Sequence, residues 1–163
     1  MKKLLLILPI GILAGILLML FHHQEESSAV EQFETWIGYA KYDTYYDSDF
    51  GYEFQYPSFF KRDDEPTYGI GHVRFSYHNQ TNITLECKVV PESVYVNRKN
   101  EFIESGVVAG MPDYQYYSHH IRKNHLWYTL TLCYHKDYKH AVSGLMAHVT
   151  NWKATSDFKL KVA

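Results

Sequence analysis

The segment L-W-Y-T-L-T-L-C-Y, from Leu126 to Tyr134, is rich in aromatic and aliphatic residues that alternate with threonines, a pattern typical of a β-strand. Residues two apart on a strand point to the same face, so one face of this strand is predicted to carry only leucine and tyrosine. Thr129, Thr131 and Cys133 share the other face. The segment therefore predicts a sheet with one apolar face that another part of the chain must cover.

The residues before this strand predict its hairpin partner. The tyrosine-rich segment 114–121 precedes it, and residues 122–124 supply a turn, which in this register places His120 opposite Leu126. Further strands are predicted wherever apolar and polar residues alternate. These strands cover residues 52–56, which end at Pro57, the hairpin pair 73–77 and 83–89, and a final edge strand at 158–162.

Helices are expected where apolar residues recur at intervals of three and four. Ser28 and Glu31 have the spacing of a capping box, which marks the start of the first helix. Gly106 is well placed to end the second helix in a left-handed conformation. The predicted helices cover residues 29–40, 97–105 and, as a long C-terminal helix, 138–152.

This order of elements predicts an α+β fold, in which an antiparallel sheet of two or more hairpins packs against the long C-terminal helix. The chain has 163 residues, and the part from 29 to 163 is long enough for one domain with its own hydrophobic core. Residues 1–28 are set apart by their composition and form a separate leader.

The leader predicts export across a membrane. Lys2 and Lys3 precede an apolar run over residues 4–21, which as a helix would be roughly 27 Å long, close to the ~30 Å of a bilayer core. That length is typical of a transmembrane anchor, whereas Ser27 and Ala29 have the small side chains of a signal-peptide cleavage site. Both alternatives place residues 29–163 on the extracytoplasmic side, membrane-anchored or secreted.

Three stretches together resemble a known family: G-Y-E-F-Q-Y-P-S-F-F at 51–60, W-Y-T-L-T-L at 127–132, and the C-terminal helix with its two aromatic ends. They look like the PsbP-like family of small exported domains, over roughly residues 50–153. The resemblance implies a non-enzymatic accessory or binding role. It carries no shared catalytic residues and no cofactor over to this chain.

The charged and titratable residues exclude several functions. Sixteen basic residues are balanced by 18 acidic ones, so no nucleic-acid partner is expected. Ten histidines raise the question of a metal site. However, His119 and His120 are strand neighbours that point to opposite faces, and His140 and His148 lack the spacing of a zinc helix. We therefore predict no metal site and no catalytic residues.

The fifteen tyrosines and two cysteines supply the remaining candidates. An oxidising compartment permits a disulfide between Cys87 and Cys133, yet strand alternation puts the two on opposite faces, so two separate thiols are the alternative. Tyrosine offers a rigid apolar ring with a polar tip. A binding groove for a peptide, glycan or protein partner is accordingly hypothesised from Tyr45, Tyr46, Tyr114, Tyr116 and Tyr117.

The sequence thus predicts a non-enzymatic extracytoplasmic binding or accessory module, attached to the membrane through its N-terminal helix. Two alternatives remain open at this point. One is a histidine- or metal-dependent hydrolase, because histidines are abundant. The other is a structural component of the cell envelope, whose anchor would matter more than its groove.

Overall fold

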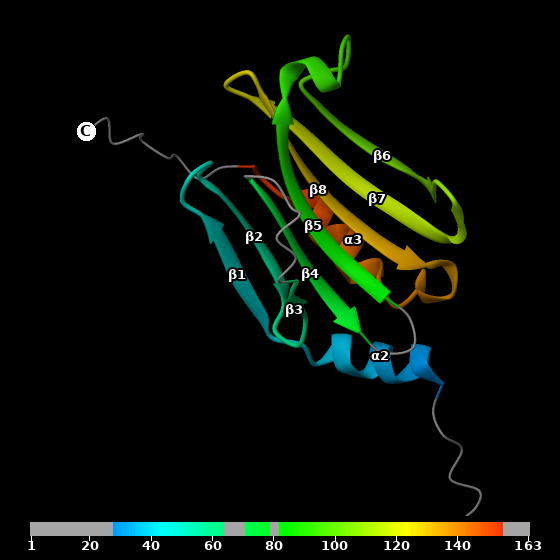
Figure 1. Cartoon of the computed structure of the whole chain (residues 1–163). Helices are drawn as coiled ribbons and strands as arrows, with labels where there is room; N and C mark the ends of the chain where they lie inside the picture. Colours follow the sequence, from blue (N-terminus) through cyan, green and yellow to red (C-terminus); the bar gives the residue numbers. More distant parts are fainter. Residues whose placement is uncertain (1–27, 64–70, 79–81, 155–163) are drawn as a thin grey trace, which may run out of the picture.

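The computed structural model describes residues 28–63, 71–78 and 82–154. Within these residues the largest element is a six-stranded antiparallel sheet (Figure 1). Its strands lie in the order β3 (Lys61–Arg62), β4 (His72–His78), β5 (Asn82–Pro91), β8 (Leu126–His135), β7 (Met111–Lys123) and β6 (Glu101–Val108).

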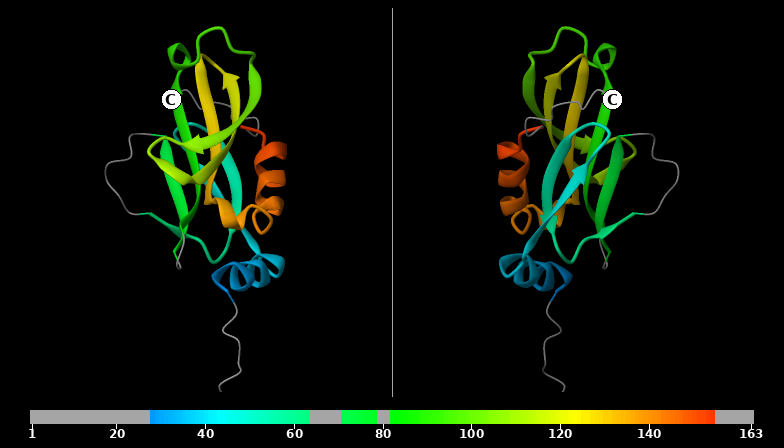
Figure 2. Two further views of the ribbon diagram at one scale, coloured as in Figure 1. Left: turned by 90° about the vertical axis from the view of Figure 1, so that its right-hand side faces the viewer. Right: turned by 90° about the vertical axis from the view of Figure 1, so that its left-hand side faces the viewer.

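A smaller hairpin and two helices accompany this sheet. The hairpin pairs β1 (Tyr42–Asp47) with β2 (Tyr52–Pro57). Helix α3 (Ser143–Asn151) lies along the sheet beside β7 and β8, and helix α2 (Ala29–Gly38) crosses one end of the molecule (Figures 1 and 2). The antiparallel sheet with helix α3 packed along it confirms the predicted α+β class.

The apolar face of the sheet carries the core. Leu85, Leu130 and Leu132 are buried there beneath the β1–β2 hairpin and α3. Aromatic rings fill much of the remaining space: Tyr45 of the hairpin meets the ring of Phe75 edge-on at 5.6 Å between centroids. The leucines and tyrosines that alternate along β8 therefore face the core as their spacing predicts.

Helix α2 begins as expected from its capping box. The Ser28 hydroxyl accepts a hydrogen bond from the Glu31 N–H at 3.2 Å, and the Glu31 carboxylate accepts one from the Ser28 N–H at 2.8 Å. Phe33 on this helix is fully buried and packs against Tyr77 and Tyr138. The helix thus closes one end of the core.

The predicted long C-terminal helix is wrong in length. The segment is divided into a short 3₁₀ turn, η2 (Lys136–Tyr138), and the nine-residue helix α3. Tyr138, Val142 and Trp152 are buried as their spacing predicts, but they belong to the turn and to the two helix ends. A 3₁₀ turn followed by a short helix keeps these apolar residues on one side, as one long helix would. The spacing of apolar residues therefore could not distinguish the two arrangements.

The helix predicted over 97–105 is also wrong, because residues 101–108 form strand β6 at the sheet edge. Gly106 does not end a helix. A Cβ at this position would lie 3.0 Å from ring atoms of Tyr116, so the missing side chain lets that ring pack over β6. Pairing with β7 outweighs the weak local helical preference.

The β7–β8 hairpin is confirmed, but its register differs from the prediction. The turn consists of Asn124 and His125, with φ angles of 51° and 61°, as in a two-residue type I′ hairpin. His120 consequently pairs with Thr129 and not with Leu126. The predicted strand at 158–162 lies outside the described residues.

We expect Leu145→Ala to lower the free energy of unfolding by about 2–5 kcal/mol, since Leu145 is fully buried and its loss leaves a cavity under α3. Ser143→Ala at the exposed start of the same helix is the matched control, with an expected change within about 0.5 kcal/mol. Chemical denaturation measures both. Equal stabilities of the two variants would contradict the burial of Leu145.

Candidate functional site

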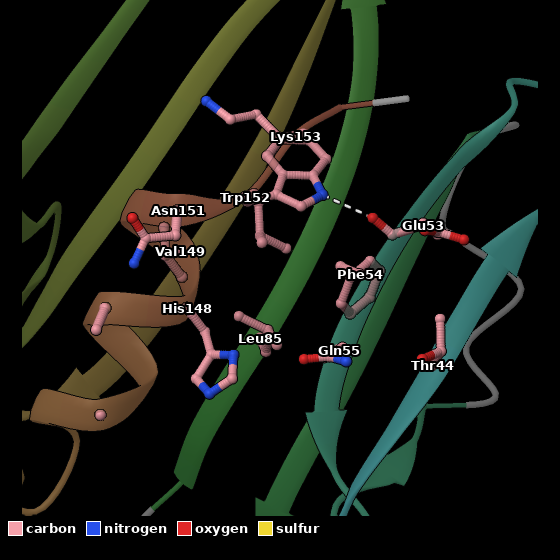
Figure 3. Close-up of a pocket in the computed structure, with 13 residues that line it drawn as sticks. Thr44, Glu53, Phe54, Gln55, Leu85, His148, Val149, Asn151, Trp152 and Lys153 are labelled. Carbon is pink, nitrogen blue, oxygen red and sulfur yellow. Dashed lines mark hydrogen bonds between the residues drawn. The ribbon is translucent and has the colours of Figure 1, made fainter. Parts of the chain in front are cut away.

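A groove of about 670 Å³ lies between the β1–β2 hairpin and α3 (Figure 3). Both elements cover the apolar face of the sheet, but they do not meet along their whole length. Leu85 and Leu130 of the sheet form the floor. The walls are formed by Thr44, Glu53, Phe54 and Gln55 on the hairpin side and by Gly144, Ala147, His148, Val149, Asn151, Trp152 and Lys153 on the helix side.

Two contacts join the β1–β2 hairpin to the α3 segment. The indole N–H of Trp152 donates a hydrogen bond of 2.7 Å to the main-chain carbonyl of Glu53 (Figure 3). The rings of Tyr42 and His148 stack at 4.4 Å between centroids with an angle of 18°. These contacts fix the width of the groove, because each ties one wall to the other.

The groove runs along an open strand edge. Within the described residues β2 pairs only with β1, and the Glu53 carbonyl that accepts from Trp152 points away from β1. In an antiparallel pair the main-chain groups of alternate residues point to the same edge. The N–H and C=O of Gln55 therefore face the groove as well, where they form a donor and an acceptor for an extended chain.

The side chains at the rim are polar and of mixed charge. Gln55 and His148 extend toward each other from opposite walls, above Leu85 (Figure 3). Glu53 and Lys153 supply one charge of each sign. An apolar floor with a few polar groups around it is typical of a binding pocket.

The five tyrosines proposed as a groove do not all share one surface, although Tyr116 and Tyr117 line a common hollow of about 360 Å³ beside β6. Tyr45 packs into the core against Phe75, and Tyr46 is exposed on β1. Tyr117 hydrogen-bonds Thr150 of α3 at 2.9 Å. Tyr116 lines a hollow on the opposite face of the sheet, and Tyr114 lies edge-on to the ring of His135, with 5.4 Å between the centroids.

Neighbouring histidines on β7 point to opposite faces, as strand geometry predicts. His119 reaches the core side, where Nδ1 lies 2.9 Å from the Val149 carbonyl and Nε2 lies 3.1 Å from the Glu101 carboxylate. His120 faces the other side and hydrogen-bonds the Thr129 hydroxyl at 3.0 Å. Within the described part of the chain, no group of three or more His, Cys, Asp or Glu side chains is arranged to hold a metal ion.

His120 borders a small polar hollow of about 280 Å³ on the sheet face opposite the core. Its side chain is stacked on Phe102 at 4.3 Å between ring centroids, and its Nε2 has no hydrogen-bond partner. The Glu104 carboxylate is 3.8 Å away. Burial, followed by the charges of His119 and Arg98, lowers the pKa of His120 to about 4, so this imidazole is neutral at physiological pH.

The two cysteines are free thiols. Cys87 of β5 pairs with Leu130 of β8, whereas Cys133 of β8 pairs with Thr84, which lies three residues before Cys87 on β5. An offset of three residues puts the two side chains on opposite faces of the sheet. Burial raises the pKa of both thiols, which keeps them protonated and unreactive.

The apolar run at 4–21 lies outside the described residues. Within the described ranges no helix combines the length and the apolar character needed to cross a bilayer.

Comparison with solved structures finds a similarity to the solution structure of cyanobacterial PsbP (CyanoP) from Synechocystis sp. PCC 6803. The match has a TM-score of 0.43 and 16% sequence identity, and it covers 68% of this chain and 90% of that chain. The matched protein carries the name of the PsbP-like family that the sequence resembles, and the similarity is weak. No protein-family model and no curated protein sequence matches the chain.

The low pKa of His120 makes stability depend on pH. In the unfolded chain a histidine titrates near 6.5, whereas in the folded chain His120 titrates near 4. Between these pH values the unfolded state binds more protons than the folded state. The free energy of unfolding therefore reaches its full value with respect to His120 above pH 6.5. It falls as the pH drops toward 4, by at most about 3 kcal/mol.

Chemical denaturation at a series of pH values gives the free energy of unfolding as a function of pH. This free energy should depend less steeply on pH for His120→Gln than for the unaltered chain. His72 also has a pKa lowered by burial and contributes a change of the same sign. The exposed Asn151 supplies the control because its amide does not titrate, so Asn151→Gln should leave the slope unchanged. A slope that is identical in all three proteins would show that His120 is not buried in its neutral form.

Proposed function

We propose that this protein is a non-enzymatic binding module that takes up short extended peptide segments in the groove between β2 and α3. A second part of the proposal is that residues 1–28 place this module on the extracytoplasmic side of a membrane. The open edge of β2 along the groove is the observation that carries the first part.

An added strand satisfies the free main-chain groups of a sheet edge. Strand β2 offers six residues, which correspond to an edge of roughly 20 Å. Gln55 contributes an N–H and a C=O that face the groove, while the Trp152 indole already occupies the Glu53 carbonyl. A segment of peptide bound beside Gln55 would therefore extend the β1–β2 hairpin to three strands and end against Trp152.

The chemistry of the walls suits a peptide in this position. Alternate side chains of a bound strand would point toward the floor at Leu85 and Leu130, where apolar side chains are favoured. The remaining side chains would face the polar rim. Main-chain hydrogen bonds give such a site affinity for many sequences, and the floor selects among them.

The location follows from the composition of the leader. Lys2 and Lys3 ahead of the apolar run are retained on the cytoplasmic side by the positive-inside rule, which directs the rest of the chain outward.

Binding of short peptides, about five residues long, tests the groove. We expect an array of such peptides with alternating apolar residues to include binders of the full-length chain, measured by fluorescence anisotropy. Ala147→Trp should weaken binding at least tenfold because Ala147 is exposed on the groove wall. Ser143→Trp adds the same side chain on α3 outside the groove lining and should bind as the unaltered chain does.

The role of the main chain is tested with the peptides themselves. N-methylation of alternate residues in a binder removes half of its main-chain donors, and one of the two methylated series should lose affinity about tenfold. Equal affinities of both series, or an Ala147→Trp variant that binds normally, would contradict strand addition in the groove.

The direction of export is tested separately. Residues 1–28 fused to a β-lactamase without its own signal should confer ampicillin resistance on a bacterial host, since this enzyme protects cells only when it is exported. Deletion of residues 4–21 from the fusion removes the apolar run and should abolish resistance. Resistance that is absent from the intact fusion, despite full expression, would refute the export signal.

A further inference from the structure

One end of the domain carries aromatic side chains that are exposed to solvent. Trp36 is 52% exposed and Tyr39 is 89% exposed, both at the C-terminal end of α2. Together with the partly buried Phe59 and the exposed Lys41 they line an open apolar hollow of about 390 Å³. These four residues are called the aromatic end below.

Two rings of the aromatic end, those of Trp36 and Phe59, are held in place by the core. Trp36 lies edge-on to Phe59 and Tyr77, at 6.1 and 6.0 Å between centroids. The hollow beside it is also fixed by the main chain, because the Ser58 N–H donates to the Lys41 carbonyl at 2.9 Å. The exposed half of the indole is therefore presented on a rigid surface.

The position of the aromatic end relates it to the leader. Helix α2 begins at Ala29 and crosses one end of the molecule, far from the segment that joins β5 to β6 (Figure 1). Residues 22–28 separate it from the apolar run at 4–21. Even fully extended, seven residues reach at most about 25 Å, so a leader kept in the bilayer holds the start of α2 within that distance of the headgroups. The aromatic end lies on the same helix, roughly 10–15 Å further along.

We propose that the aromatic end docks on the headgroup layer of the membrane that carries the leader. This inference rests on the second part of the proposed function, in which residues 1–28 enter that membrane. Tryptophan and tyrosine are enriched at membrane interfaces, because their rings are apolar while the indole N–H and the hydroxyl remain hydrated. Lys41 suits the same layer, since its stem can lie along apolar groups while its ammonium reaches the phosphates.

The proposal predicts a contact in which the apolar groups dominate and Lys41 adds only a single charge. Glu31 and Glu34 are exposed on α2, so the helix as a whole has no positive patch for anionic lipids. A few aromatic groups bind a bilayer weakly on their own. The leader makes docking an intramolecular event with a high effective concentration, and a weak contact then suffices.

Depth-dependent quenching tests the docking. The full-length chain is reconstituted into vesicles of phosphatidylcholine with brominated acyl chains, and co-sedimentation confirms its insertion. Trp127 and Trp152 are buried, so the difference between the emission of the unaltered chain and that of Trp36→Phe reports on Trp36. We expect most of this difference to be lost in brominated vesicles, compared with unbrominated ones, and the loss to persist at high salt.

A second variant controls for tethering without docking. Val96 is 69% exposed in the segment that joins β5 to β6, so Trp36→Phe combined with Val96→Trp moves the exposed indole to the other end of the domain. Its emission should not be quenched. Equal quenching of both indoles, unquenched Trp36 in vesicles that contain the chain, or quenching that high salt removes would each overturn the proposal.

The test separates this inference from the proposed function. Trp36 lies outside the groove lining, so Trp36→Phe should bind peptides normally. Failure of docking with intact peptide binding and intact export of the β-lactamase fusion would remove the membrane contact alone.

Discussion

The structure depends on covering one apolar face of a six-stranded sheet. Leu85, Leu130 and Leu132 lie on that face, and leaving such side chains in water would cost about 1.5–3 kcal/mol each. The chain covers them with two unlike elements, the β1–β2 hairpin and α3. The two elements are joined by the hydrogen bond between Trp152 and Glu53 and by the stacked rings of Tyr42 and His148. The groove is the space between these contacts.

Much of this arrangement could be predicted from local patterns in the sequence. Strand alternation identified β2, β4, β5 and β8, and it placed His119 and His120 on opposite faces. The capping box at Ser28 marked the start of α2. These patterns succeed because each depends only on residues close together in the chain. The export leader stays a prediction.

Other features depended on contacts between distant segments. Strand β1 has no alternating pattern. Its turn is fixed by Asp47, whose carboxylate accepts hydrogen bonds from the N–H groups of Asp49 and Phe50, and by the positive φ of Gly51. The D-x-D-x-G spacing was a local signal for this turn. Without β1, the sequence did not reveal that β2 has an open edge, so Gln55, His148 and Trp152 were not identified as groove residues. The tyrosine groove stays a prediction.

Trp152 has a double role that limits how this protein can change. Its ring is buried in the core, and its N–H holds the β2 wall of the groove. Replacing it would alter the domain as a whole, and the same holds for Leu85 and Leu130 in the floor. Four other groove residues are exposed and do not belong to the core, namely Thr44, Gln55, Ala147 and Asn151. These four positions could therefore be exchanged to change the shape and polarity of the groove while the same scaffold stays intact.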